Sequence, residues 1–343
     1  MASPHILVFP FMAKGHTFPM LQLARLLLRH GAAVTLITTP WNRPLISSCL
    51  SDTTISVIDI PFPQNLQSIP PDVESTDKLP DISLWPDLLA ATKLMQPHFE
   101  QVIQSLPRIH FMITDFFLGW TLDSAIKYSI PRLACYTIGI FPSCLARLVS
   151  EGRFVAGEEG IKLAEFPSIK LEREEGPLCS GLKWRYCRPR VNFLWLVRKN
   201  ELDEGFEERV KSRGTLVKEW VDQREILEHE TVRGFLCHCG WNSVMESLCA
   251  KVPILAWPMM WEQPLNARMV VDVAGVGLRV EGCNGFVESE ALAKAAKELM
   301  EGSAGEEVRK KAEEVGGAAV KAVEEGGSSW EALDQLINEL NSF

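Results

Sequence analysis

The sequence predicts an α/β protein with two domains, each built on a doubly wound and mostly parallel sheet. Short apolar runs alternate with amphipathic helical segments along most of the chain. The length of 343 residues allows two domains of about 100–200 residues each. Polar residues follow several of the apolar runs, where parallel strands end and where such sheets bind ligands.

In the first half, the apolar run His5 to Phe9 predicts a buried strand, and a loop is expected at 12–17. A leucine-rich helix is predicted from about Met20 to Arg29, closed by Gly31. The connection at 61–80 is rich in proline and is expected to be mobile surface, with a lid or acceptor-side loop as a further interpretation. Further strands are expected at 34–38, 55–60, 110–114 and 132–136, and helices within 81–106 and at about 120–128.

In the second half, polar residues again follow the predicted strands. Asn242 and Ser243 are expected to cap a helix that runs to about 250, since both residue types are good N-caps. The mixed charges of 306–325 predict a solvated helix, and 171–190 shows no convincing strand. Strands are expected at 192–197, 215–218, 235–237, 254–257 and 276–280, and further helices at about 203–212, 287–300, 304–324 and 329–341.

Composition excludes several classes of protein. A net charge of −9 argues against a nucleic-acid partner, and the basic cluster Lys183, Arg185, Arg188, Arg190 is interpreted as a short solvated patch. No stretch approaches the ~20 apolar residues of a membrane helix. Nine cysteines without repeated spacing, and no secretory leader, favour a cytoplasmic protein with reduced thiols, expected to be a monomer. Cys237-His238-Cys239 is not expected to bind metal, because adjacent strand residues alternate faces.

The 44 residues from Trp220 to Gln263 carry the strongest motif. Their pattern includes His-Cys-Gly-Trp-Asn-Ser at 238–243, Trp-Pro at 257–258 and Glu-Gln at 262–263. This stretch resembles the signature box of plant family 1 UDP-dependent glycosyltransferases. The resemblance implies the GT-B fold, with two Rossmann-like domains facing a cleft. It implies an acceptor domain at 1–170, an irregular junction at 171–191, and a UDP-sugar domain at 192–343 whose last helix packs back on the first domain.

The run Gly15-His16-Thr17-Phe18-Pro19 resembles the family's Gly-His-x-x-Pro, whose histidine is the catalytic base. Asp115 follows the strand at 110–114, in a setting similar to the family's partner aspartate. A carboxylate bonded to an imidazole fixes its tautomer and stabilises the imidazolium. Without the motif, His16 would be a surface or capping residue and Asp115 a helix N-cap. Asp123, nearby, is interpreted as a solvated helix residue.

The resemblance also assigns the residues that bind the donor. Trp220 would stack on uracil, although an isolated Trp is otherwise a core residue. Glu246 and Gln223 would bind the ribose, with a capping box as the alternative for Glu246. A phosphate site at the helix start after residue 240, and an acid–amide pair for the sugar, complete the set. The donor residues are Trp220, Val221, Gln223, His238, Trp241, Asn242, Ser243, Glu246, Glu262 and Gln263, with UDP-glucose the expected co-substrate and no cofactor.

Members of the family have more chain between about 150 and 191 than this sequence. Their second domain begins with a strand that ends in a Phe-Gly-Ser-like phosphate loop, whereas Cys179-Ser180-Gly181 has no apolar run before it. The resemblance therefore implies a member with an internal deletion, whose second domain lacks its first strand–helix unit. The expected activity is inverting transfer of glucose to a hydroxyl of a small lipophilic acceptor such as a flavonoid, phenolic or hormone. The alternative is an inactive member that retains nucleotide-sugar binding.

Overall fold

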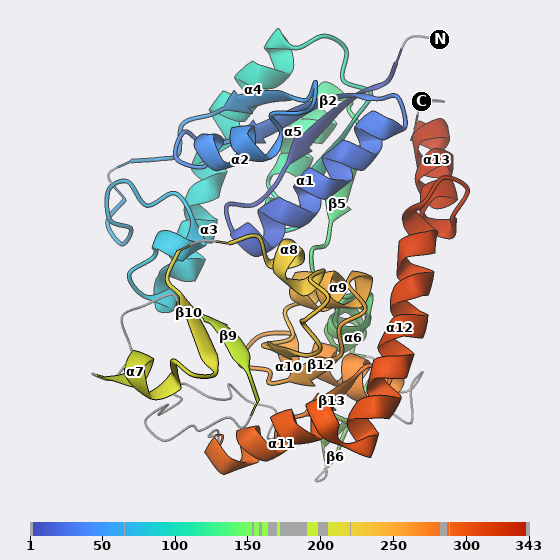
Figure 1. The fold of residues 1–343 in the computed structure, drawn as a ribbon. Helices are drawn as coiled ribbons and strands as arrows, with labels where there is room; N and C mark the ends of the chain where they lie inside the picture. The colour runs from blue at the N-terminus through green and yellow to red at the C-terminus, as the bar shows by residue number, and fades with distance from the viewer. Residues whose placement is uncertain are drawn as a thin grey trace. The chain divides into compact units, whose positions relative to one another are not determined.

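The structure is a computed structural model of the whole chain (Figure 1). It describes residues 3–64, 66–152, 154–157, 160–163, 170–171, 191–197, 205–219, 221–281, 287 and 289–340. The chain divides into two compact units, Met1–Thr137 with Glu325–Phe343, and Ile138–Glu324. The first unit thus ends earlier than the expected boundary at residue 170, and it takes in the C-terminal helix α13.

The first unit is a parallel five-stranded sheet with the order β3-β2-β1-β4-β5. The chain order reverses between β1 and β4, as expected for a doubly wound sheet. Its elements are β1 (His5–Phe9), α1 (Lys14–Arg29), β2 (Ala33–Thr38), α2 (Arg43–Cys49), β3 (Ser56–Asp59), η1 (Thr76–Lys78), η2 (Ile82–Leu84), α3 (Trp85–Thr92), η3 (Lys93–Met95), α4 (Gln96–Ser105), β4 (Phe111–Asp115), α5 (Thr121–Tyr128), β5 (Arg132–Cys135) and α13 (Ser328–Leu340).

The sheet of the first unit is buried on both faces. Along β1 successive side chains alternate, so that Ile6 and Val8 join one core and Leu7 and Phe9 the other. The first core is closed by α1, α2 and α13, the second by α3, α4 and α5 (Figure 1). Helix α13 contributes Ile337 to the first of these cores. Burial on both faces explains the continuous apolar runs of the strands.

Two expectations for the first unit are wrong in detail. Helix α1 begins at Lys14 and not near Met20, so His16 lies in its first turn although Gly15 and Pro19 are poor helix formers. The connection at 61–80 also packs against the core rather than lying wholly on the surface. Phe62 and Ile69 are buried, and Thr76 N donates to Met12 O at 3.0 Å.

The second unit contains three groups of strands among its described residues. Strands β9 and β10 pair in parallel, β11-β12-β13 form a parallel sheet, and β6-β7-β8 form an antiparallel one. The elements are α6 (Ile140–Ser150), β6 (Phe154–Gly157), β7 (Gly160–Leu163), β8 (Lys170–Leu171), β9 (Phe193–Leu196), α7 (Phe206–Val210), β10 (Gly214–Val217), α8 (Gln223–Leu227), β11 (Phe235–Cys237), α9 (Trp241–Cys249), β12 (Ile254–Ala256), α10 (Gln263–Arg268), the π-helix η5 (Met269–Val273), β13 (Gly277–Arg279), α11 (Ser289–Glu301) and α12 (Ser303–Val323).

Strand β12 is the centre of the sheet that carries the signature box. Ile254 and Ala256 pack into one core with α9, α10 and α12, while Leu255 faces the other core with α11. Strands β11 and β12 pair in parallel, so the residues that follow them lie at the same edge of the sheet. The edge carries His238 after β11 and Trp257 after β12.

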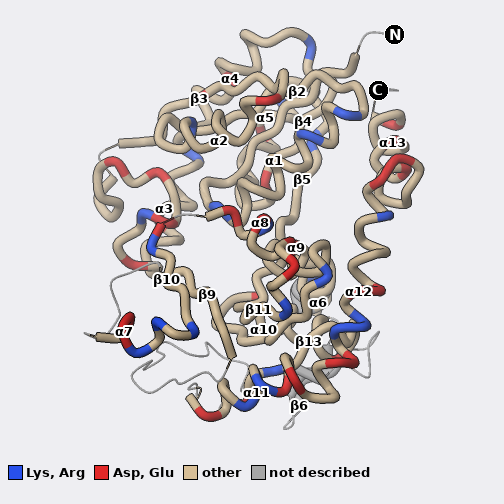
Figure 2. Tube along the Cα trace, viewed as in Figure 1, with Lys and Arg blue, Asp and Glu red and all other residues tan. Residues whose placement is uncertain are grey.

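The second unit also departs from the expected pattern. The sequence does not predict strands β6 to β8. They are short and antiparallel, unlike the parallel strands of the other sheets. Helix α12 is not wholly solvated, since Val308, Ala312 and Gly316 are buried. A Cβ at Gly316 would lie 2.1 Å from Leu248 O, so glycine allows α12 to approach α9 closely. Acidic and basic residues are interspersed along α12 (Figure 2). Within the described ranges, no helix has the length and apolar character needed to cross a bilayer.

Candidate active site

The first candidate group joins His16 and Asp115 in the first unit. His16 lies in the first turn of α1, and Asp115 is the last residue of β4. The two residues meet because β1 and β4 are adjacent parallel strands that end at the same edge. His16 Nδ1 lies 2.8 Å from Asp115 Oδ2. Asp115 is fully buried, whereas the His16 side chain keeps 17% of its surface exposed.

This contact decides which nitrogen of His16 carries the proton. An ionised carboxylate only accepts hydrogen bonds, so the proton belongs on Nδ1 and the lone pair on Nε2. The second carboxylate oxygen of Asp115 accepts from Phe117 N at 3.0 Å. Asp115 is therefore held by both oxygens, and Nε2 of His16 is left as a base.

Thr137 is a third residue of the group, and the sequence did not predict its role. Its hydroxyl Oγ1 lies 2.8 Å from His16 Nδ1, the same atom that contacts Asp115. Thr137 follows β5, which lies beside β4, and so it reaches the same sheet edge. Its place just past a predicted strand could have indicated a site residue. Its partner His16, however, is 121 positions away in the chain, so no local pattern predicts the contact.

Aromatic rings enclose the imidazole of His16. Phe117 stacks on it with ring centroids 5.0 Å apart, and Phe11 meets it edge-on at 5.6 Å. Cys135, at the end of β5, is partly buried close to this group. Burial and the neighbouring Asp115 raise the pKa of the Cys135 thiol to about 11, which keeps it neutral at physiological pH. The immediate surroundings of His16 are therefore largely apolar apart from its two polar partners.

The second candidate group lies at the start of α9 in the second unit. The expected cap residues Asn242 and Ser243 do not cap the helix; its N-cap is Gly240, with no side-chain cap. The first intrahelical bond runs from Val244 N to Gly240 O, so the N–H groups of the first turn have no intrahelical partner. Together with the helix dipole, these donors favour an anion such as a diphosphate.

Glu246 accepts hydrogen bonds from side chains of two helices. Its Oε1 accepts from Asn242 Nδ2 at 2.7 Å, and its Oε2 accepts from Gln223 Nε2 at 2.6 Å. Gln223 also donates to Ser243 Oγ at 3.1 Å. The carboxylate is thus engaged by side chains of α8 and α9 and does not form a capping box. The structure brings together four residues that the signature box places up to 23 positions apart.

His238 lies between two buried cysteines. Cys237 and Cys239 are buried, whereas His238 is exposed, so successive side chains alternate as a strand requires. The hydrogen bond with the side chain of Cys239, and burial, raise the pKa of the Cys237 thiol well above its usual value. The ring of His238 lies against Gly240, where an added Cβ would be 2.4 Å from Nε2. Within the described ranges, no group of three or more acidic, His or Cys side chains could hold a metal ion.

The acid–amide pair Glu262-Gln263 stands at the start of α10. Glu262 is the N-cap residue, and Gln263 is the first helical residue. Gln263 Oε1 accepts from Met259 N and Met260 N, both at 3.0 Å, so it closes the loop after β12. Among the described residues, no hydrogen bond is seen from its amide nitrogen, which can donate. Trp261 in this loop has a left-handed φ of 61° and is 58% exposed.

Asn266 is a further residue that the sequence did not single out. It is fully buried on α10, and its Nδ2 donates to Cys239 O at 2.9 Å. Cys239 has a positive φ of 64°, which is unfavourable for a residue with a Cβ. Asn266 therefore holds the strained turn that leads into α9. It links the loop of the acid–amide pair to the helix start.

Three assigned residues remain to be placed. Val221 is half-buried directly before the N-cap of α8, and Trp241 is half-buried as the first residue of α9. Trp220, the expected uracil platform, lies outside the described residues, as do Cys179 to Gly181 and the basic cluster at 183–190. The predicted stacking of Trp220 therefore stays a prediction.

Comparison with known proteins relates these groups to one family. A family model described as UDP-glucoronosyl and UDP-glucosyl transferase matches residues 145–310. UDP-glycosyltransferase 90A1 of Arabidopsis thaliana is 38% identical, over 98% of this chain and 96% of the relative. The chain belongs to the plant UDP-glycosyltransferases. A more distant relative, UDP-glucose flavonoid 3-O-glucosyltransferase 7 of Fragaria ananassa, is 28% identical over 99% of this UDP-glycosyltransferase.

Solved structures agree with this assignment. Glycyrrhiza uralensis UGT73P12, complexed with glycyrrhetinic acid 3-O-monoglucuronide, has a TM-score of 0.79 and 25% identity, covering 99% of this UDP-glycosyltransferase and 96% of that chain. Arabidopsis thaliana UGT89C1, complexed with UDP-L-rhamnose, has a TM-score of 0.78 and 24% identity, with 99% and 100% covered. The fold is therefore GT-B, with Rossmann-like parallel sheets.

The alignment with 90A1 also shows that this UDP-glycosyltransferase is short. It spans 459 positions, but 98% of 343 residues is only about 336, so about 120 positions have no residue from this chain. A gap of that size within an alignment that covers nearly all of both proteins agrees with the expected internal deletion.

Proposed function

We propose that this UDP-glycosyltransferase moves glucose from UDP-glucose to a hydroxyl of a small lipophilic acceptor, with inversion at the anomeric carbon. The observation that carries the proposal is the buried Asp115 carboxylate 2.8 Å from Nδ1 of a partly exposed His16. Such a pair makes Nε2 a general base for an acceptor hydroxyl. Membership of the family supports the class of reaction, and the contact between His16 and Asp115 supports His16 as the residue that deprotonates the acceptor.

The chemistry follows from the direction of proton and electron movement. His16 Nε2 takes the proton of the acceptor hydroxyl, and the resulting imidazolium is stabilised by Asp115. The acceptor oxygen forms a bond to the anomeric carbon as the bond from that carbon to the diphosphate oxygen breaks. UDP leaves with the electron pair. Attack from the side opposite the leaving group inverts the anomeric configuration.

The second unit would hold the donor. The unpaired N–H groups at the start of α9, with His238, would bind the diphosphate, and Glu246 would accept from the ribose hydroxyls. Glu262 and Gln263 would bind the sugar. Fixed donors of this kind stabilise charge that develops on the leaving UDP, so we propose turnover without a metal ion. Glutamine at 263 resembles the glucose-using members of the family and is the reason for choosing glucose.

Two observations favour an aromatic acceptor. Phe11, Phe116 and Phe117 lie around His16, and Trp85 meets Phe117 edge-on at 5.0 Å. Such rings bind the faces and edges of a planar phenol. The Fragaria ananassa relative is named for a flavonoid acceptor. A phenolic or flavonoid hydroxyl is therefore the proposed acceptor.

A second candidate function is donor binding without turnover. The shortening by about 120 positions favours it, because the family's second domain begins in the region that is missing. The phosphate loop expected there would have supplied further donors to the diphosphate. The box residues around Glu246 could still bind UDP in its absence.

One experiment separates these functions. The purified full chain is incubated with UDP-glucose and a panel of phenols and flavonoids, and UDP is titrated separately by calorimetry. We expect a glucoside, and His16→Ala should reduce kcat/KM by about 10²–10⁴-fold while UDP affinity stays unchanged. His98→Ala, at an exposed histidine of α4, is the matched control. UDP binding without any glucoside would establish the second candidate, and loss of UDP binding in His16→Ala would refute the assigned role.

A further inference from the structure

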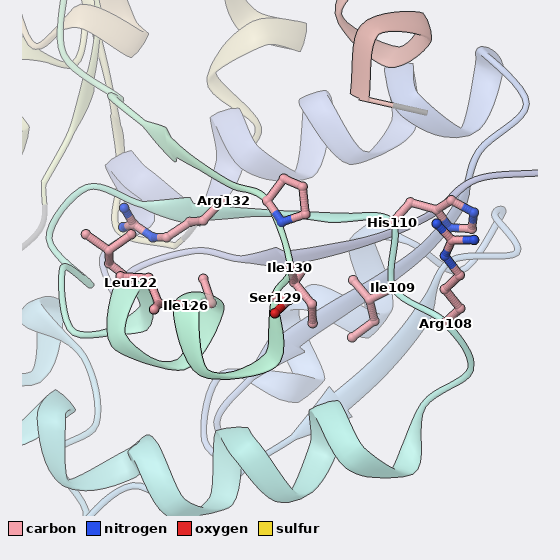
Figure 3. A pocket seen from close by; sticks show the side chains of 10 residues that line it. Arg108, Ile109, His110, Leu122, Ile126, Ser129, Ile130 and Arg132 are labelled. Carbon is pink, nitrogen blue, oxygen red and sulfur yellow. The ribbon is translucent and has the colours of Figure 1, made fainter. Parts of the chain in front are cut away.

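A groove on the first unit lies away from the His16 group. It runs between α5 and the edge strand β5, and its volume is about 480 Å³. Arg132 lies at one end, beside Leu122, and Arg108 and His110 lie at the other, with Ser129 and Ile130 between them (Figure 3). The groove opens near the amino ends of β4 and β5, whereas His16 and Asp115 meet at their carboxyl ends.

One wall of the groove is an apolar stripe of α5. Leu122, Ala125 and Ile126 of α5 recur at the spacing of a single helix face, and Ser129, the C-cap residue, follows them. Leu122 is 47% exposed and Ile126 is 70% exposed, which is unusual for large aliphatic side chains on a helix that packs on a sheet. In the described residues β5 pairs only with β4, so its other edge has no strand partner there.

Arg132 supplies a half-buried cation at the end of this stripe. Its Nε donates to Thr114 Oγ1 and Thr121 Oγ1, both at 2.8 Å, and its Nη2 donates to Leu118 O at 3.4 Å. None of these acceptors is charged, and within the described ranges no carboxylate forms an ion pair with Arg132. Burial lowers the pKa of the guanidinium, because a partly desolvated cation is destabilised, while Tyr136 and Asp115 oppose this shift. An anion at this position would restore favourable electrostatics.

The dimensions of the groove limit what could occupy it. From Leu122 to Tyr128, the last residue of α5, is six helical steps, or about 9 Å along the axis. That length matches a medium-chain acyl group or a pair of fused aromatic rings. Apolar walls favour such a body, and cationic side chains at the ends favour an anionic group. The exposed Arg108 adds positive charge at the far end without narrowing the groove.

We propose that this groove is a binding site for an amphipathic organic anion, with its carboxylate or sulfonate on Arg132 and its apolar body along Leu122 and Ile126. Binding would remove the exposed aliphatic surface of α5 from water, which is favourable in proportion to its area. It would also give Arg132 a charge-assisted hydrogen bond through a guanidinium nitrogen that has no charged partner.

The test uses decanoate as the probe, titrated into the full chain by calorimetry at submicellar concentration. Decanol and decyltrimethylammonium have the same chain length without the negative charge. We expect saturable binding of one decanoate, and affinities at least about 10-fold weaker for the two analogues, since a charged hydrogen bond is lost. Equal binding of decanol would show a purely apolar surface and would refute the role of Arg132.

Two variants locate the site. Ile126→Glu places a carboxylate on an exposed wall position and should weaken decanoate at least about 10-fold by repulsion and lost apolar contact. Val273→Glu makes the same kind of change at a 64% exposed position of the second unit and should have no effect. Arg132→Gln should weaken binding to a similar degree, whereas Arg147→Gln, at an 80% exposed side chain, should not. Ile126→Glu keeps the test decisive if Arg132→Gln does not fold.

Two further outcomes would overturn the proposal. Decanoate that still binds Ile126→Glu and is displaced by a phenolic acceptor would occupy the site of His16 instead. In the other case decanoate does not bind and the wild-type chain self-associates. Sedimentation velocity would then show oligomers of the wild type and a monomer for Ile126→Glu. The groove would then be an interface between copies of this chain. Neither outcome bears on the glycosyl transfer itself, which the glucoside assay measures separately.

Discussion

His16 Nδ1 and Asp115 Oδ2 lie 2.8 Å apart although 99 positions separate the two residues in the chain. The contact forms because β1 and β4 are neighbours in a parallel sheet, with Val8 opposite Ile113 and Phe9 opposite Thr114. Asp115 is the last residue of β4, and His16 follows the carboxyl end of β1, so both lie at the sheet edge where doubly wound sheets bind ligands. The fold itself therefore brings the proposed base to its partner.

The role of Asp115 predicts a selective loss of turnover. Asp115→Asn should lower kcat by about 10²–10⁴-fold, because an amide can stabilise the tautomer with the proton on Nε2 and cannot stabilise the imidazolium. UDP affinity by calorimetry should stay unchanged. Asp123→Asn, at an exposed position of α5, is the matched control and should keep full activity. Equal rates for Asp115→Asn and the wild type would remove Asp115 from the mechanism.

The donor group predicts a loss of nucleotide affinity. Glu246→Gln replaces an acceptor of two side-chain donors, Asn242 and Gln223, with a neutral amide. The Kd for UDP should rise by roughly 10–100-fold, since hydrogen bonds to charged groups contribute about 1.5–3 kcal/mol. Calorimetric titration of UDP measures the change, with Glu228→Gln at an exposed position as the control. An unchanged Kd would mean that Glu246 has only a structural role.

Asn266 predicts a coupled effect on stability and on donor binding. Asn266→Ala leaves Cys239 O without its buried donor, which should cost about 1–3 kcal/mol of unfolding free energy. The loosened turn before α9 should also weaken UDP binding. Urea denaturation and UDP titration measure the two effects, and Asn338→Ala, an exposed asparagine of α13, should change neither. A stability loss with unaltered UDP affinity would confine Asn266 to packing.

His5 predicts a dependence of stability on pH. Burial lowers the pKa of His5, and the nearby His110 lowers it further, while backbone hydrogen bonds oppose these effects. As the pH falls below about 6.5, the unfolded chain binds a proton that folded His5 does not bind, so the free energy of unfolding decreases until the folded pKa is reached.

Thermal unfolding at about pH 7.5 and about pH 5.5 would measure this effect. Replacing His5 with glutamine should make the difference in Tm smaller, whereas His229→Gln, at an exposed histidine, should leave it as in the wild type. A difference in Tm that is the same in the wild type and in His5→Gln would exclude His5 as its source.

The sequence by itself determined the strand–helix order and the family. Continuous apolar runs such as His5 to Phe9 are what a sheet buried on both faces requires, and each becomes a strand. The signature box identified Gln223, Asn242, Ser243 and Glu246 by their spacing, and the structure gathers these four residues into one hydrogen-bonded group.

Only the tertiary structure decided which residues support the candidate site. Thr137 reaches His16 across 121 positions, and Asn266 reaches Cys239 across 27, through contacts that no local pattern encodes. The early start of α1 at Lys14 likewise overrides the weak helix propensity of Gly15 and Pro19. Local periodicity reports which face of an element is buried, whereas the pairing of distant side chains depends on which strands become neighbours. The contacts of His16 with Asp115 and Thr137 therefore form only because β1, β4 and β5 are neighbours in the folded sheet.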